Sequence, residues 1–435
     1  MPGIWKCTRG VLPVLAVRTL CVSTVLILAM ASSLRAGPPD SDWPQFLGPQ
    51  RNGISQEKGL NWDWKKQPPK TRWKMPLGSG FSSLTVVGER VFTLAKRGPR
   101  DIVVCLSTHD GRELWSADGA PSYVDFQRQG AGPRSTPTYH DGKLYCLFAT
   151  GELVCLTVEG KPVWEKSIFK DTGAAPPSQK IFYWGVSFSP LVVDNLVIVQ
   201  PGGSMDSSVV AFHKDTGQII WKAGSDPIGY SSPIMITVQG TRQLVCPTGT
   251  SCLGIDPAKG TILWRYAFGN EFKTNCANPV WSDNLLFLSA AYGTGCAVLD
   301  VIKTSDGSWE VKEKWRDKKL MQNLFATSVI LDKNIYGCSG DLRVISLRCL
   351  DLETGTMHWE ERLPQRAHLL AVDGRILLWD EHGNLRFFEV NPLALQSRGE
   401  LSELLRFKSW AAPALAGGRL YVRDERHALC VDLRK

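Results

Sequence analysis

The chain has 435 residues, of which 43% are hydrophobic and 21% are charged, and its formal net charge is +8. This length allows two or three ordinary domains or one large β-rich repeat domain, so internal repeats are considered first. The positive charge is small and scattered, which argues against binding of nucleic acid or of an anionic membrane through a basic surface.

Residues 1–36 have the features of a secretory signal peptide. Their basic residues, without any acid among them, are Lys6, Arg9, Arg18 and Arg35. An uncharged apolar run follows over residues 19–34, with small residues near Ala36. An uncleaved anchor is the alternative, but this run is shorter than the ~20 residues of a spanning helix. No lipoprotein motif precedes Cys21. We expect cleavage near Ser33 or Ala36, a net charge near +4 afterwards, no transmembrane segment, and a periplasmic or secreted location.

Residues 37–69 precede the repeats described below. They contain Trp43, Phe46, Trp62 and Trp64, which makes them too apolar for a free tail. We therefore predict that this N-terminal segment wraps along the outside of the folded domain.

From residue 70 onward the chain repeats a turn that is followed by a tryptophan, as in the stretch Asp215 to Trp221. The intervals between these tryptophans suit a four-stranded propeller blade, because the intervening segments are rich in β-branched residues and turn signals. A turn glycine such as Gly217 supplies the positive φ of a short hairpin. We predict that the tryptophans dock blade on blade, each burying roughly 150–250 Å². They are Trp73, Trp115, Trp164, Trp221, Trp264, Trp315 and Trp359.

Each repeat opens with a step rich in Ser, Thr or Ala that often ends in proline, which fits the first residue of a strand. Eight such steps occur, near Phe81, Ser135, Phe188, Ser231, Ala277, Ala326, Ala367 and Ala411. The sequence thus predicts an all-β fold, an eight-bladed β-propeller over residues 70–435 with four antiparallel strands in each blade.

The two ends of the repeat region complete each other. The last unit stops at residues 430–433, before its fourth strand, while residues 71–75 around Trp73 form a fourth strand without a unit. We predict that the N-terminal strand completes the last blade and closes the ring, which removes open sheet edges. The seventh unit has no tryptophan over residues 388–404, so we expect an altered outer strand there.

Ten of the twelve cysteines follow the predicted signal peptide. Several lie in apolar strand-like runs, as Cys105, Cys155 and Cys349 do, and are predicted to be buried small hydrophobes. Cys246 and Cys252 are the one close pair. A disulfide between them stays open as an alternative, because an exported protein can form disulfides.

The motif Ala/Cys-x-Asp followed by Gly-x-x-x-Trp resembles the tryptophan-docking repeat of quinoprotein-type eight-bladed propellers. This group includes pyrroloquinoline-quinone (PQQ) dehydrogenases and the outer-membrane assembly factor BamB. The stretches 42–49, 183–187, 229–233 and 292–296 are also similar to exported PQQ-like propeller proteins of planctomycete bacteria. The resemblance implies the fold, and it leaves open whether the function is enzymatic or BamB-like binding.

The resemblance to PQQ dehydrogenases would imply a quinone over a tryptophan, a Ca²⁺ held by carboxylate and amide oxygens, and an Asp as base. Many of these enzymes also cap the quinone with a disulfide between adjacent cysteines, and this chain has no adjacent cysteines. It also lacks the H-E-x-x-H, C-x-x-C and G-x-S-x-G motifs. We expect no catalytic residues, no metal and no cofactor. A dehydrogenase that uses PQQ and Ca²⁺ to oxidise an alcohol or sugar is the alternative.

The propeller topology predicts where a partner would bind. Connections from each fourth strand to the next first strand, and loops between second and third strands, should meet at one mouth of the channel. The candidate interaction residues there are Trp184, Tyr230, Asn275, Tyr292, Asn323, Arg366 and Trp410. Aromatic, Asn and Arg side chains suit a protein, peptide or glycan contact, although Trp184 and Trp410 could instead only pack the neck. We predict a monomeric non-catalytic scaffold that binds a protein or an envelope polymer and no nucleic acid.

Overall fold

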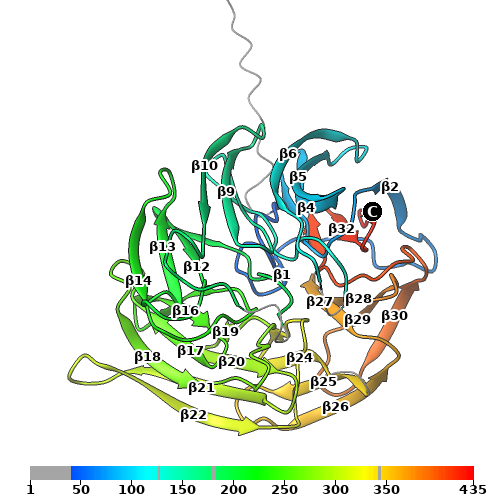
Figure 1. Ribbon diagram of the computed structural model, residues 1–435. Helices are drawn as coiled ribbons and strands as arrows, with labels where there is room; N and C mark the ends of the chain where they lie inside the picture. The colour runs from blue at the N-terminus through cyan, green and yellow to red at the C-terminus, as the bar shows by residue number, and fades with distance from the viewer. Residues whose placement is uncertain (1–40, 126–127, 178–182, 341–343) are drawn as a thin grey trace, which may run out of the picture. The chain divides into compact units, whose positions relative to one another are not determined.

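The computed structural model describes residues 41–125, 128–177, 183–340 and 344–435 (Figure 1). All of them belong to one compact unit. Within these residues the regular structure is β-sheet, and no helix is long and apolar enough to cross a membrane. The predicted signal peptide lies outside the described residues.

Eight sheets surround a central axis, as predicted (Figure 1). Seven of them have four strands, and the sheet of blade seven has a fifth from the N-terminal segment. The first two blades are β3 (Thr85–Val87), β4 (Arg90–Arg97), β5 (Arg100–Ser107) and β6 (Glu113–Pro121), then β7 (Thr138–His140), β8 (Lys143–Leu147), β9 (Glu152–Thr157) and β10 (Pro162–Ser167). The next two are β11 (Leu191–Val193), β12 (Leu196–Val199), β13 (Val209–His213) and β14 (Ile219–Ala223), then β15 (Ile234–Val238), β16 (Thr241–Pro247), β17 (Ser251–Ile255) and β18 (Ile262–Ala267).

Blades five and six are β19 (Val280–Ser282), β20 (Leu285–Ala290), β21 (Gly295–Lys303) and β22 (Trp309–Asp317), then β23 (Val329–Leu331), β24 (Asn334–Ser339), β25 (Ile345–Asp351) and β26 (Met357–Leu363). Blade seven is β27 (Ala367–Val372), β28 (Arg375–Asp380), β29 (Leu385–Glu389) and β30 (Gln396–Leu401), with β1 (Ile54–Ser55) added at its inner edge. Blade eight is β31 (Ala414–Ala416), β32 (Arg419–Arg423), β33 (His427–Asp432) and β2 (Lys70–Pro76).

The N-terminal strand closes the ring as predicted. β2 pairs antiparallel with β33, and Trp73 stands opposite Cys430. The first strands of neighbouring blades contact one another around the axis, while the fourth strands face solvent. The middle strands are buried on both faces and read as continuous apolar runs, whereas the outer strand β10 is mostly half-buried or exposed. The core therefore lies between blades.

Most of the predicted docking tryptophans rest on the turn of the following blade. The Trp73 indole donates to the carbonyl oxygen of Thr108 at 3.1 Å, and its ring lies against Gly111. A Cβ atom at Gly111, which has a φ of 73°, would stand 2.6 Å from the ring. A glycine is thus required in this turn for two reasons: the backbone has a positive φ, and the tryptophan ring leaves no room for a Cβ atom. The same pairing joins Trp115 to Gly160, Trp164 to Gly217, Trp221 to Gly260, and Trp315 to Gly355.

Trp264 departs from this pattern. Its indole donates to the Gln243 side chain at 2.6 Å and lies against Gly254 of its own blade. The next blade has an extended β21–β22 hairpin, visible at the lower left of Figure 1, in which Lys303 pairs with Trp309. Val311 stands there at the position that the docking glycine holds in blades one to four and in blade six, so Trp264 has no glycine to rest on.

Blade seven has a regular outer strand, and its missing tryptophan is supplied by the N-terminal segment. Trp64 is 5% exposed and packs on Phe387, with ring centroids 4.5 Å apart. A Cβ at Gly399 in β30 would stand 3.0 Å from the Trp64 ring. The Trp64 indole donates to the Asn61 carbonyl oxygen at 2.9 Å, and Asn61 N donates to the Leu433 carbonyl oxygen at 2.7 Å. In blade eight no turn joins the third strand β33 to the fourth strand β2, and the segment around Asn61 and Trp64 takes the place of that turn.

The expectation that the whole N-terminal segment wraps outside the ring does not hold for residues 42–55. Trp43 bridges Val86 on the first strand of blade one, and β1 pairs in parallel with the first strand of blade seven. These residues therefore cross the middle of the ring, where β1 is seen in Figure 1. The innermost strands have backbone N–H and C=O groups on their free edges, and the segment forms hydrogen bonds with those of β3 and β27. Its buried side chains Trp43 and Leu47 also fill the channel.

The Ser/Thr-rich opening steps form a belt of hydrogen bonds around the channel, in which a backbone N–H of one blade donates to a side-chain oxygen of the next. The belt runs from Ser83 N to Thr136 Oγ1 (3.1 Å), Thr136 N to Ser189 Oγ (2.9 Å), Ser189 N to Ser232 Oγ (2.9 Å), Ser232 N to Asn278 Oδ1 (2.9 Å) and Asn278 N to Thr327 Oγ1 (3.0 Å). His368 and Ala412 occupy the corresponding positions in blades seven and eight.

Arg423 joins blade eight to blade one, where Ala412 cannot continue the belt. Its guanidinium is buried and donates to the carbonyl oxygens of Leu94 at 2.8 Å and Gly78 at 3.1 Å. Burial lowers the pKa of Arg423 to about 10, which leaves it charged at neutral pH. Three features thus close the ring: the pairing of β2 with β33, the packing of Trp64 from the N-terminal segment on blade seven, and the buried Arg423.

All ten described cysteines are free thiols, and nine of them are buried, as predicted for those in apolar strands. Cys246 and Cys252 are not bonded to each other. Cys246 stands opposite Leu253 and Cys252 opposite Pro247, so their side chains point to opposite faces of the sheet. This geometry prevents the disulfide that the sequence left open.

Candidate functional site

The N-terminal segment closes one end of the channel. Arg51 is 2% exposed and donates to the carbonyl oxygens of Pro233 at 2.8 Å, of Ser189 and of Pro190, and to Gln45 Oε1 at 2.9 Å. Burial lowers the pKa of Arg51 to about 9. The guanidinium thus ties the segment to blades three and four from inside the ring. The channel is blocked at this end.

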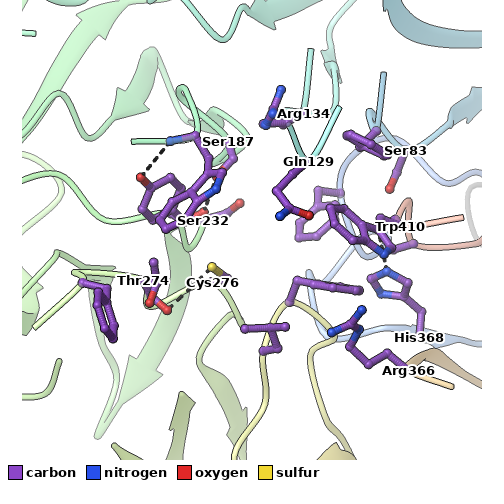
Figure 2. Close-up of a pocket in the computed structure, with 18 of the residues that line it drawn as sticks. Ser83, Gln129, Arg134, Ser187, Ser232, Thr274, Cys276, Arg366, His368 and Trp410 are labelled. Carbon is purple, nitrogen blue, oxygen red and sulfur yellow. Dashed lines mark hydrogen bonds between the residues drawn. The ribbon is translucent and has the colours of Figure 1, made fainter. Parts of the chain in front are cut away.

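A cavity of about 490 Å³ lies above this segment and faces the opposite end of the channel (Figure 2). This size is within the range of small-ligand sites. Its lining comes from most of the blades and from the N-terminal segment: Phe46, Phe81, Ser83, Gln129, Arg134, Trp184, Ser187, Tyr230, Ser232, Phe272, Thr274, Cys276, Tyr292, Leu324, Phe325, Arg366, His368, Trp410 and Ala412. Eight of these residues are Phe, Tyr or Trp, so the interior is mainly aromatic.

One wall of the cavity is built around Trp410. Its ring lies 5.2 Å from Phe81 and 5.3 Å from Phe325, measured between ring centroids. The indole Nε1 donates to Glu381 Oε2 at 2.8 Å, and Arg366 Nη2 contacts the same oxygen at 2.9 Å. These contacts fix the indole in place before any partner arrives.

The opposite wall carries two pairs of aromatic rings. Trp184 and Tyr230 meet edge to face with centroids 5.9 Å apart, and the Tyr230 hydroxyl accepts from Trp184 N at 3.3 Å. Phe272 and Tyr292 meet edge to face at 5.4 Å. The two walls come from blades far apart in the sequence.

The two arginines of the lining are paired with acids that stand behind them. Arg134 contacts Asp125 at 3.3 Å and donates to the Gly130 carbonyl oxygen at 2.8 Å, while Arg366 contacts Glu381. Burial lowers the pKa of Arg134, and the nearby Asp125 opposes this shift. No Asp or Glu belongs to the described lining. The cavity therefore carries little net charge.

His368 and Cys276 are of the residue types most often used in catalysis among the lining residues, and burial shifts the pKa of each away from neutral pH. His368 Nε2 donates to the Trp410 carbonyl oxygen at 2.8 Å, and burial lowers its pKa to about 4, so the ring is neutral at pH 7. Burial raises the pKa of the Cys276 thiol to about 12, which keeps it protonated. His368 is therefore a weak base, and Cys276 holds little of the thiolate form that acts as a nucleophile.

Exposed apolar side chains stand in loops on the face that the cavity opens to. Val124 is 59% exposed, Met205 is 67% exposed and Val344 is 58% exposed. Val124 lies in a connection between blades, and the other two lie between second and third strands, so all three share this face by topology. A second cavity of about 260 Å³ adjoins the first and shares Tyr230 and Phe272 with it.

The structure places five of the seven candidate interaction residues in the cavity lining: Trp184, Tyr230, Tyr292, Arg366 and Trp410. The other two are buried in structural hydrogen bonds. Asn275 Nδ2 donates to the Thr248 and Phe268 carbonyl oxygens, and Asn323 Nδ2 donates to that of Cys338.

Sequence reasoning missed several aromatic lining residues. Phe81 and Phe325 stand at or just before opening steps and could have been found by extending the same rule to every blade. Phe46 could not, because nothing in the repeat places the N-terminal segment inside the ring.

The donor set of the cavity does not fit PQQ with a bound Ca²⁺. Such a site needs carboxylate and amide oxygens that converge on the ion. The described lining has no carboxylate, and the described residues contain no cluster of three His, Cys, Asp or Glu side chains that could hold a metal. Gln129 is the one amide side chain of the lining. The residues of this cavity therefore do not form a PQQ–Ca²⁺ site.

Comparison with known proteins identifies the architecture. The family described as outer membrane protein assembly factor BamB matches residues 54–200 and 205–348, more than half of the chain. No curated protein matches significantly.

Solved structures share the fold at low sequence identity. BamB from Moraxella catarrhalis is 13% identical with a TM-score of 0.58, over 84% of this chain and 99% of that one. A quinohemoprotein alcohol dehydrogenase from Comamonas testosteroni is 12% identical with a TM-score of 0.64, over 91% and 81%. The computationally designed Ika8 protein is 11% identical with a TM-score of 0.56, over 83% and 99%. One propeller architecture thus serves an assembly factor, an enzyme and a designed protein, so the fold alone does not assign a function.

Proposed function

The chain belongs to the family described as outer membrane protein assembly factor BamB, and from this premise we propose that it is an exported, non-catalytic β-propeller that binds a protein or an envelope polymer. The observation that carries the proposal is the blind, aromatic cavity at one face of the ring. Rigid aromatic side chains gathered in a pocket are typical of residues that dominate binding energy.

The chemistry of the cavity supports binding over catalysis. A hydrolytic or proton-transfer site needs a base or nucleophile whose pKa suits the working pH. Burial lowers the pKa of His368 to about 4, which makes it a weak base, and keeps Cys276 protonated, while both lining arginines are paired with acids. The fixed rings of Trp410, Phe81 and Phe325 instead offer a preorganised contact surface, which lowers the entropy lost on binding.

The proposal of export is supported by the sequence of residues 1–36, which has a basic start and an apolar run. In the periplasm or outside the cell, the protein would present the cavity face to envelope components as a monomer. N-terminal sequencing of the purified mature protein tests this part. Cleavage near Ser33 or Ala36 would give a first residue between positions 34 and 37. An intact N-terminus would refute the export proposal.

Photocrosslinking tests the binding proposal. The residue p-benzoylphenylalanine is introduced in place of Gln129 at the cavity, and separately in place of Leu393, which is 87% exposed in a loop on the opposite face. Irradiation of cells of the source organism should give a reproducible adduct from position 129 and none from position 393. No adduct at position 129, or equal adducts at both positions, would count against the cavity face as the binding surface.

A further inference from the structure

We infer that the cavity receives one large uncharged apolar side chain, aromatic or branched aliphatic, from a protein partner that docks on this face. The inference deepens the proposed function and rests on it. It identifies the partner as a polypeptide with a protruding anchor residue and excludes a polymer that threads the ring.

Charge decides against a charged occupant. Arg134 and Arg366 each contact a carboxylate behind the cavity wall, at 3.3 Å and 2.9 Å. A ligand anion would have to compete with Asp125 and Glu381, which are already in place. A ligand cation would meet two guanidinium groups and no lining carboxylate. An uncharged anchor avoids both penalties, since burying a charge without a partner is costly.

The closed end of the channel decides against a threaded chain. Phe46 belongs to the segment that Arg51 ties into the ring, and it forms part of the cavity floor. A chain that entered the cavity could not pass through the ring. An occupant must therefore end or turn back inside the cavity, and a single side chain from a docked protein does so.

The polar groups of the lining are mostly engaged with the protein itself, which disfavours a sugar. The Ser187 hydroxyl donates to the Tyr230 carbonyl oxygen at 3.3 Å, and the Thr274 hydroxyl donates to Asn270 Oδ1 at 3.1 Å. The Ser232 hydroxyl accepts from Ser189 N at 2.9 Å. A buried sugar would leave many of its own hydroxyls without partners, whereas an apolar side chain needs none.

The surface around the cavity fits a protein. Val124, Met205 and Val344 are each more than half exposed in loops on this face. A central aromatic pocket within a surface that carries apolar side chains matches the arrangement of protein interfaces, where a few anchors enter pockets and the surroundings exclude water.

A peptide selection tests the inference. Linear peptides displayed on phage are selected on the full mature protein and counter-selected on the cavity-filling variant Ala412→Phe. A second variant, Cys276→Phe, fills the cavity from the other wall, and both are used only after their thermal midpoints match that of the wild type. Binding of synthetic copies of the selected peptides is measured by fluorescence polarisation, and an array of neutral and acidic oligosaccharides is probed in parallel.

The inference predicts that selected peptides share one large apolar residue. Replacing this residue by alanine, or filling the cavity, should weaken binding more than about tenfold, as expected for an interface anchor. Peptides that bind both filled variants as well as the wild type, the absence of enriched peptides, or binding of an oligosaccharide in their place would each overturn the inference. A crosslink from position 129 that survives in both filled variants would leave the proposed function standing and refute only the anchor.

Discussion

Replacing Trp64 by alanine should lower the free energy of unfolding more than replacing a surface tryptophan does. The indole is 5% exposed, packs on Phe387 and Gly399, and donates to the Asn61 carbonyl oxygen. Burying a tryptophan removes roughly 150–250 Å² from water, which at about 25 cal/mol/Å² corresponds to about 4–6 kcal/mol. Measured Trp→Ala losses of about 3–5 kcal/mol agree with this range, so we expect about 4 kcal/mol.

Thermal unfolding by circular dichroism provides the readout. A folded unit of roughly 400 residues has an unfolding entropy of about 0.8 kcal/mol/K, so a loss of about 4 kcal/mol lowers Tm by about 5 °C. Hydrogen exchange should also speed up locally in β30 (Gln396–Leu401), because Trp64 covers this strand. The variant Trp64→Phe keeps most of the apolar contact and loses the hydrogen bond, so about 1–2 kcal/mol is expected.

Trp309 provides a matched control, because it is only half-buried and lies in the extended hairpin of blade five. Its replacement by alanine should lower Tm by less than about 2 °C and leave exchange in β30 unchanged, since lost apolar burial sets the scale of the effect. Equal losses for the Trp64 and Trp309 variants, with no change in β30, would refute the reasoning that the N-terminal segment supplies the seventh docking tryptophan.

Three further results are expected. Ser189→Ala removes the belt acceptor of Thr136 N and leaves a buried donor unpaired, so unfolding should show a loss of about 1–3 kcal/mol, while Ser83→Ala at the equivalent place in blade one should be nearly neutral. Burial raises the pKa of Asp101 from 3.8 to about 6, so the folded protein binds a proton that the unfolded chain has already lost. The free energy of unfolding should therefore fall as pH rises from about 4 to 6. The variant Asp101→Asn should not show this fall and should be more stable than the wild type at pH 7–8. Purified protein mixed with PQQ and Ca²⁺ should show no bound quinone absorbance and no dye reduction with alcohols or sugars.

Each of these three predictions can be contradicted by a specific result. Equal losses for the two serine variants would mean that the belt bond contributes nothing at Thr136. A fall in stability between pH 4 and 6 that persists in Asp101→Asn would show that the titration of Asp101 does not cause it. A bound quinone would replace binding with dehydrogenase chemistry as the leading function.

The repeat revealed the fold because each blade carries its own local signals. The turn glycine and the tryptophan four residues later occur in one blade after another, and the unpaired fourth strand around Trp73 predicted closure on Cys430. The loops at the channel mouth followed from topology, so Trp184 and Trp410 could be predicted at that mouth, where both line the cavity.

What the sequence could not reveal depends on contacts without a periodic signal. Arg51 lies in no repeat, and only the folded ring brings the carbonyl oxygens of Ser189 and Pro233 together around it. Asn275 and Asn323 occupy the right loops, but backbone carbonyls in those loops capture their amides. Composition at a loop position therefore predicts proximity to the mouth better than it predicts which way a side chain points.

The most direct measurement combines the crosslinker at position 129 with Ala412→Phe in one protein. If the cavity is the binding site, the adduct formed by the wild-type cavity should disappear when the cavity is filled, while the thermal midpoint stays unchanged. An undiminished adduct from the filled and fully folded protein would contradict the insertion of a partner side chain into the cavity, and the partner would then bind elsewhere on this face.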